Sequence, residues 1–150
     1  MSLKRRWHNF RQTPVRRLLL VVEAAFWLCI ARLALIFVRF PVIGRYLGTL
    51  NAPSNNHEAL NVPRSSVLDI KFAVDCASRY LPVKMVCLPC ALAGWQMLKL
   101  RNTNGRLHFG AARDPNGKLL THAWLDAYGI EITGYPVAHD HVEIGYFTRT

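Results

Sequence analysis

The sequence predicts an α+β fold in which N-terminal helices are followed by a helix packed on a small antiparallel sheet. Three observations predict this. Apolar residues recur at helical spacing over the first two thirds of the chain, strand-like segments fill the last third, and turn signals such as Asn104-Gly105 separate those segments. Because the helices precede the strands, an α+β layout is favoured over an alternating one. The length of 150 residues is enough for one domain.

The first helical region is expected over residues 15–47, and Pro41 could divide it into two helices. Residues 18–37 of this region are apolar except for Glu23 and Arg32. Positive residues precede the stretch, as in a signal anchor, but two charges near the middle of a membrane span would be costly. We therefore expect a helix that packs on the core or lies at a membrane surface.

Two more helices should follow a polar loop at residues 51–56. Residues 66–80 should form an amphipathic helix, because apolar side chains recur at intervals of three and four residues. The next helix should begin at Cys87 and end near Arg101. Pro89 suits its first turn, where a missing amide proton costs nothing.

Four strands are then expected, at residues 107–112, 119–127, 130–134 and 142–147. A tight hairpin at Tyr128-Gly129 should join the second of them to the third. It would place Asp126 opposite Glu131. In the same register Trp124 would lie opposite Thr133, and the strands would form a meander.

The net charge of +10 is concentrated at the N-terminus, where the first seventeen residues hold six basic side chains and no acidic one. The basic residues are Lys4, Arg5, Arg6, Arg11, Arg16 and Arg17. A tail of this kind is usually a solvated arm, but it could contact acidic lipid headgroups or an acidic peptide. The aromatic and basic residues are not interleaved, so we expect no nucleic-acid partner.

The cysteines indicate the compartment. Cys29 and Cys76 lie among apolar residues and are expected to be small buried side chains, whereas Cys87 and Cys90 begin a helix. Nothing in their spacing suggests a disulfide framework, which favours a reducing cytoplasm.

Cys87 and His122 are the candidate catalytic residues. A thiol at a helix N-terminus lies where the aligned peptide dipoles favour the thiolate, and an imidazole nearby would activate it as a nucleophile. His122 lies on the expected strand 119–127 and shares a face with Trp124 and Asp126. The pair predicts cysteine-based acyl transfer.

A third residue usually orients the imidazole of such a pair. Asp126 shares the strand of His122, but it would lie about 13 Å away along a straight strand, beyond hydrogen-bond reach. Glu131 on the next strand and Asp140 in a later loop are the other candidates. The residues alone leave the third member open.

Two other sites could use the same residues. Cys87 and Cys90 form a Cys-x-Pro-Cys pair, as in thiol-disulfide oxidoreductases, although helices precede it where a strand–helix–strand frame is expected. Alternatively, the two cysteines with His139 and His141 would make a zinc set, but the histidine spacing is unusual for zinc. We expect no metal and no cofactor. Outside catalysis, the chain could be a membrane-surface or scaffold protein.

Several segments together resemble a known family. They are Cys87-Leu88-Pro89-x-Ala91-Leu92-Ala93, the glycine-flanked strand near Gly110, His122-Ala123-Trp124-Leu125-Asp126 with Gly129, Leu81-Pro82, Arg16-Arg17-Leu18-Leu19-Leu20 and Glu23-Ala24-Ala25. The chain is similar over nearly its whole length to the transglutaminase-like leader peptidases of lasso-peptide biosynthesis. This resemblance implies a transglutaminase/papain-like core at residues 65–150, preceded by a basic tail and apolar helical region at residues 1–50.

The resemblance also implies a function. A cytoplasmic cysteine peptidase of this kind removes the leader from a ribosomally made precursor peptide, and a macrolactam synthetase then closes the ring. A separate small winged-helix protein recognises the leader where the peptidase stands alone, as it would here. Such sites place an Asp on the strand after the histidine strand, and residues 130–136 hold none. Cys90 departs from the basic or amide side chain that is frequent at its position.

Overall fold

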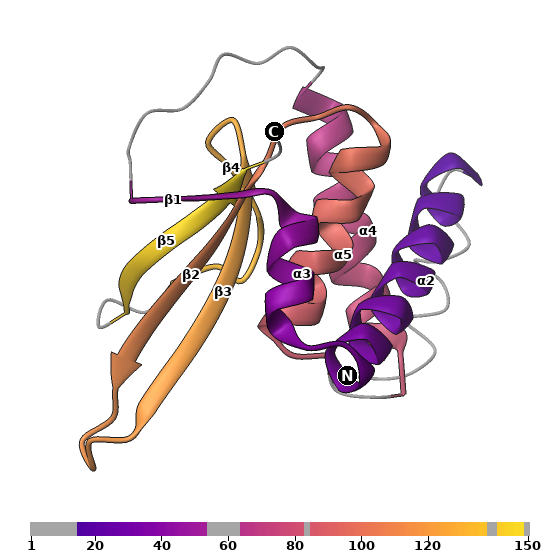
Figure 1. Ribbon diagram of the computed structural model, residues 1–150. Helices are drawn as coiled ribbons and strands as arrows, with labels where there is room; N and C mark the ends of the chain where they lie inside the picture. The colour runs from indigo at the N-terminus through magenta and orange to yellow at the C-terminus, as the bar shows by residue number, and fades with distance from the viewer. Residues whose placement is uncertain (1–14, 54–63, 83–84, 138–140, 149–150) are drawn as a thin grey trace.

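The computed structural model describes residues 15–53, 64–82, 85–137 and 141–148. Over these residues the chain forms four helices and a five-stranded antiparallel sheet, which confirms the α+β prediction (Figure 1). The helices are α2 (Val15–Phe37), α3 (Phe40–Leu47), α4 (Arg64–Tyr80) and α5 (Cys87–Leu100). The strands are β1 (Thr49–Asn51), β2 (Arg106–Arg113), β3 (Leu119–Ala127), β4 (Ile130–Thr133) and β5 (Val142–Thr148).

The sheet order is β1-β5-β2-β3-β4, so the expected meander is wrong in one respect. The last strand, β5, does not continue beyond β4 but returns to the other side of β2, where Leu107 pairs with Phe147. The short strand β1, which the sequence did not predict, then pairs with β5. This return leaves β4 at one edge of the sheet.

The break between the first two helices lies before Pro41. Helix α2 ends at Phe37, and Pro41 lies in the first turn of α3, where its fixed φ suits the start of a helix. Cys29 of α2 is exposed, so the expectation that it is buried is wrong. The helix is apolar on two faces, and only one of them packs on the protein.

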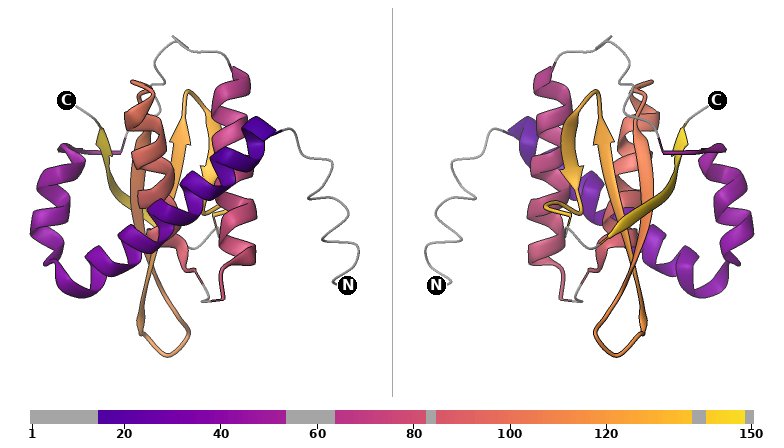
Figure 2. Two further views of the ribbon diagram at one scale, coloured as in Figure 1. Left: turned by 90° about the vertical axis from the view of Figure 1, so that its right-hand side faces the viewer. Right: turned by 90° about the vertical axis from the view of Figure 1, so that its left-hand side faces the viewer.

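The helices lie on one face of the sheet, and α2 crosses over α4 and α5 on the side away from the strands (Figures 1 and 2). The backbone of α5 comes close to the sheet at Gly94, where a β-carbon would lie 2.6 Å from Leu125 Cδ2. Buried side chains from every helix and from the sheet join in one apolar core, among them Leu28, Leu47, Ile70, Met97 and Leu125. This packing fixes the first turn of α5 relative to β3 and β4.

The hairpin between β3 and β4 sets the position of the segment that follows. Tyr128 and Gly129 both have positive φ, as a two-residue type I′ turn requires, and Asp126 pairs with Glu131 as predicted. The register then shifts, because Leu125 and not Trp124 lies opposite Thr133. The extra residue in β4 forms a β-bulge. As a result Gly134, the first residue after β4, lies against Trp124.

Candidate active site

Cys87 is the first residue of α5, as the sequence predicts. Val86, just before it, has an extended backbone. Its side chain makes no capping hydrogen bond to the backbone N–H groups of the first turn of the helix. The positive end of the helix dipole therefore lies beside a free, half-buried thiol.

Cys90 lies one turn further along α5 and is also a free, half-buried thiol. Burial, followed by the proximity of Cys87 and Asp75, raises the pKa of Cys90 to about 11. At neutral pH this thiol is protonated and is a poor nucleophile. The two cysteines at the start of α5 therefore differ in environment.

His122 is held by a main-chain group. Its Nε2 lies 2.7 Å from the carbonyl oxygen of Gly134, just after β4. Because a carbonyl oxygen can only accept a hydrogen bond, Nε2 must carry the proton, and Nδ1 of the neutral ring keeps a free lone pair. The ring also stacks on Trp124, with centroids 5.8 Å apart, and meets the edge of His141 at 5.5 Å. These contacts fix the ring plane.

A cleft of about 480 Å³ adjoins this region, although neither Cys87 nor His122 is among the described residues that line it. It lies between α4, the first turn of α5 and the end of β4, and both Cys90 and Gly134 line it. Helix α5 covers the face of β3 that bears Leu125, whereas His122 is on the alternate face with Trp124. The first turn of α5 and His122 thus approach Gly134 from two sides, and a direct contact between Cys87 and His122 stays a prediction.

Two of the three carboxylates suggested as a third member, Asp126 and Glu131, lie among the described residues, and neither is hydrogen-bonded to His122. Asp126 is buried and its Oδ1 lies 2.6 Å from Nε2 of His108. Glu131 is exposed on β4, and Asp140 lies outside the described residues. Within the part of the chain that the structure describes, the group bonded to His122 is the Gly134 carbonyl.

The described ranges contain no group of three or more His, Cys, Asp or Glu side chains that could hold a metal ion, so they give no support to the zinc alternative. His139, one of the four residues it needs, lies outside those ranges.

A cluster around His108 is a feature that sequence reasoning missed. Its Nδ1 lies 2.6 Å from Glu143 and its Nε2 2.6 Å from Asp126, while the ring stacks on Trp124 at 5.4 Å. The available signal was a histidine on β2 near an aspartate on β3, which becomes visible only once β2 is paired with β3. The cluster holds together the sheet face that carries His122.

Comparison with protein families gives one result. The family model described as "Transglutaminase-like superfamily" matches residues 33–144, which is more than half of the chain. The chain belongs to the transglutaminase-like superfamily. No curated protein and no solved structure matches it significantly. The match supports cysteine-peptidase-like chemistry and is consistent with the helix-on-sheet core.

This transglutaminase-like chain holds no aspartate at residues 130–136, and the group bonded to His122 is the backbone carbonyl of Gly134, just after β4. Gly134 has φ of +81°, and a β-carbon there would lie 2.5 Å from the carbonyl oxygen of Ala123 and 2.8 Å from Trp124 Cβ. Only glycine fits this backbone. The carbonyl of Gly134 therefore occupies the place of a side-chain partner for His122.

Substitution of Gly134 tests whether only glycine fits this backbone position. We expect Gly134→Asp, which supplies the missing carboxylate, to destabilise the protein by about 2–4 kcal/mol, because strain and overlap outweigh any gain. Gly134→Ala should cost nearly as much, since the β-carbon causes the overlap. Urea denaturation of both variants measures this. Gly117→Ala is the matched control, since it also has positive φ but no atom lies within 4 Å of its β-carbon position.

Proposed function

We propose that the protein is a cysteine peptidase that removes the leader from a ribosomally made precursor peptide of the lasso type. Cys87 is the nucleophile and His122 is the general base. The proposal is supported by membership of the transglutaminase-like superfamily, by a thiol at the start of α5, and by the hydrogen bond from His122 to Gly134. Resemblance of the cysteine and His-Ala-Trp segments supports the lasso class.

The hydrogen bond at Nε2 of His122 is the observation that carries the mechanism. It keeps the proton on Nε2 and leaves Nδ1 to take the proton of a thiol. When the ring becomes an imidazolium, the negative end of the Gly134 carbonyl dipole stabilises the new charge. A neutral dipole stabilises less than a carboxylate does, so this site works as a cysteine–histidine dyad with a main-chain orienting group.

The reaction then follows ordinary acyl transfer. The Cys87 sulfur attacks the carbonyl carbon of the scissile peptide bond, and the oxyanion is held by backbone N–H groups near the start of α5. His122 gives its proton to the departing amine, which is the N-terminus of the core peptide. Water then attacks the thioester, with His122 taking its proton, and releases the leader with a free carboxylate.

The cleft beside the site could hold the substrate. It is bordered by apolar side chains of α4, Leu68 and Phe72, and by the charged side chains Lys71 and Asp75. A peptide lying along the β4 edge would pass Gly134 and reach the first turn of α5. Mixed lining of this kind fits an extended peptide with alternating apolar and polar side chains.

The proposed function includes partners and a compartment. A small winged-helix protein would bind the leader and present it, and a macrolactam synthetase would use the freed amine of the core peptide. All of these steps would take place in the cytoplasm. The free thiols Cys29, Cys76, Cys87 and Cys90 are compatible with a reducing compartment.

A reconstituted reaction tests the proposal. The full chain is incubated with a lasso-type precursor and the winged-helix partner, and the products are measured by mass spectrometry. We expect two fragments whose masses add up to the precursor plus one water. Alkylation of the protein with iodoacetamide should stop the reaction, and peptide mapping should place the label on Cys87.

Two controls make the result decisive. Binding of the leader by the partner is shown first by gel filtration, so that a missing substrate complex is not mistaken for an inactive enzyme. Cys29 is an exposed thiol remote in sequence from the site and serves as the matched alkylation control in a Cys29→Ser variant. A precursor that stays intact beside a bound partner would rule out the proposed activity.

A further inference from the structure

Helix α2 has an apolar outer face that the protein leaves uncovered. Its inner face buries Val21, Ala24, Leu28 and Ala31. On the other side seven apolar residues recur every three or four positions and are 41 to 72% exposed. We call them the outer stripe: Val15, Leu19, Val22, Phe26, Ile30, Leu33 and Ile36. A surface helix normally has polar residues there, so the stripe requires a partner.

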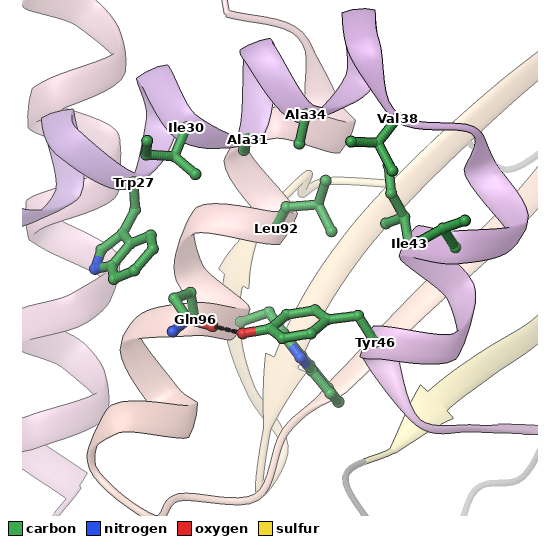
Figure 3. Close-up of a pocket in the computed structure, with 11 residues that line it drawn as sticks. Trp27, Ile30, Ala31, Ala34, Val38, Ile43, Tyr46, Leu92 and Gln96 are labelled. Carbon is green, nitrogen blue, oxygen red and sulfur yellow. Dashed lines mark hydrogen bonds between the residues drawn. The ribbon is translucent and has the colours of Figure 1, made fainter.

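The stripe continues into a hollow between α2, α3 and α5 (Figure 3). The hollow has a volume of about 320 Å³, and Ile30 belongs both to it and to the stripe. Trp27 and Ile30 belong to the row of α2 side chains along one side of it, and a hydrogen bond from the Tyr46 hydroxyl to Gln96 Oε1 lies across from that row (Figure 3). Its lining is otherwise almost entirely apolar, so the uncovered apolar surface extends beyond one helix.

The charges on α2 and α3 are mostly of one sign. The described residues 15–53 hold five basic side chains and one acidic side chain. The single acid, Glu23, is already paired with Arg101 at 2.7 Å. Basic residues stand near both ends of the stripe, with Arg16 at one end and Arg39 at the other. An apolar face flanked by positive charge fits an anionic lipid bilayer, whose interior is apolar and whose headgroups are negative.

By length and composition, α2 is the helix among the described residues that could cross a membrane. The contacts of its inner face argue against a membrane-spanning position and favour a helix that lies on the membrane surface. Glu23 makes a two-pronged ion pair with Arg101 of the α5 end, and Arg17 pairs with Asp69 of α4 at 3.0 Å. A spanning helix would have to give up these pairs and its core packing. A helix lying in the interface keeps both and covers only the outer stripe.

We propose that the outer stripe docks the protein on the surface of an anionic lipid bilayer, with α2 lying parallel to the membrane and its inner face still on the core. The basic side chains contact the headgroups, and the adjoining hollow gives acyl chains an apolar surface. This inference does not depend on the peptidase function.

Vesicle flotation with the full chain tests the proposal. We expect binding to phosphatidylcholine vesicles that contain about one third phosphatidylglycerol, weaker binding to phosphatidylcholine alone, and a decrease as salt is raised. Leu19→Ser/Phe26→Ser/Leu33→Ser should reduce partitioning at least about tenfold, because three apolar side chains no longer enter the lipid. Far-UV circular dichroism and thermal melting show that this variant is folded.

The matched control removes exposed apolar residues elsewhere. Val142→Ser/Ile144→Ser changes two residues of β5 that are 71 and 66% exposed, and it should bind vesicles as the wild type does. Failure of the wild type to float with anionic vesicles, or equal binding by the triple variant, would overturn the proposal. So would retention of the protein after alkaline carbonate extraction, which would indicate a span. A dimer that the triple variant dissociates, without vesicle binding, would assign the stripe to a second copy.

Discussion

Leader removal is expected to fall at least about 10,000-fold when Cys87 is replaced by alanine, because no other group at the start of α5 can form the acyl-enzyme. The replacement removes one half-buried sulfur from the first position of a helix where no side-chain cap is lost. The fold should therefore persist, with a melting temperature close to that of the wild type. Initial rates with the winged-helix partner at saturation measure the effect.

Cys90→Ala is the matched control for that loss. Its thiol stands one turn further along α5, in the wall of the cleft, and its pKa of about 11 keeps it protonated at neutral pH. We expect its rate to stay within about threefold of the wild type. Equal loss in both variants would favour the Cys-x-Pro-Cys redox pair instead, and full activity of Cys87→Ala would exclude this residue as the nucleophile.

The elements of the fold were predictable because their signals are local. Helical spacing places α4, and the alternating run Leu119–Ala127 is β3 to the residue. The order of the strands was less accessible. Nothing in the sequence near Val142 shows that β5 pairs with β2, because the pairing joins segments that are distant in the sequence, such as Leu107 and Phe147.

The candidate site, like the fold, was predictable only where the signal is local to the sequence. Cys87 and His122 could be singled out because their side chains carry recognisable chemistry. The group that holds His122 is a main-chain carbonyl, which every residue has, so no residue type marks it. Its position also depends on the bulge in β4, which no turn signal predicts. The group bonded to His122 among the described residues therefore could not be found by searching for a side-chain carboxylate.

Replacement of His108 by leucine is expected to destabilise the protein by about 3–5 kcal/mol, the largest stability effect that we predict. His108 and Asp126 are 6 and 4% exposed, and their bond is 2.6 Å long. Leucine would leave the buried carboxylate of Asp126 without its imidazole partner. Denaturation in urea, with the midpoint and slope compared, measures the loss.

The pH dependence of stability should identify the charge on this ring. Both ring nitrogens face carboxylates, Glu143 and Asp126, so both must donate, as only the imidazolium can. Burial alone would lower the pKa of His108, but the hydrogen bonds to the two carboxylates outweigh it and raise the pKa above its ordinary 6.5. The stabilisation is therefore complete below about pH 6.5 and is lost as the pH rises through the raised pKa.

Paired variants separate the ion pair from packing. The gap in stability between the wild type and His108→Gln should be larger at about pH 6 than at about pH 9, since glutamine does not titrate. His108→Leu/Asp126→Leu should recover much of the loss of His108→Leu, because the double variant removes the more deeply buried of the two carboxylates and leaves only the half-buried Glu143. Additive losses in the double variant would mean that shape, and not charge, makes His108 important to the face that carries His122.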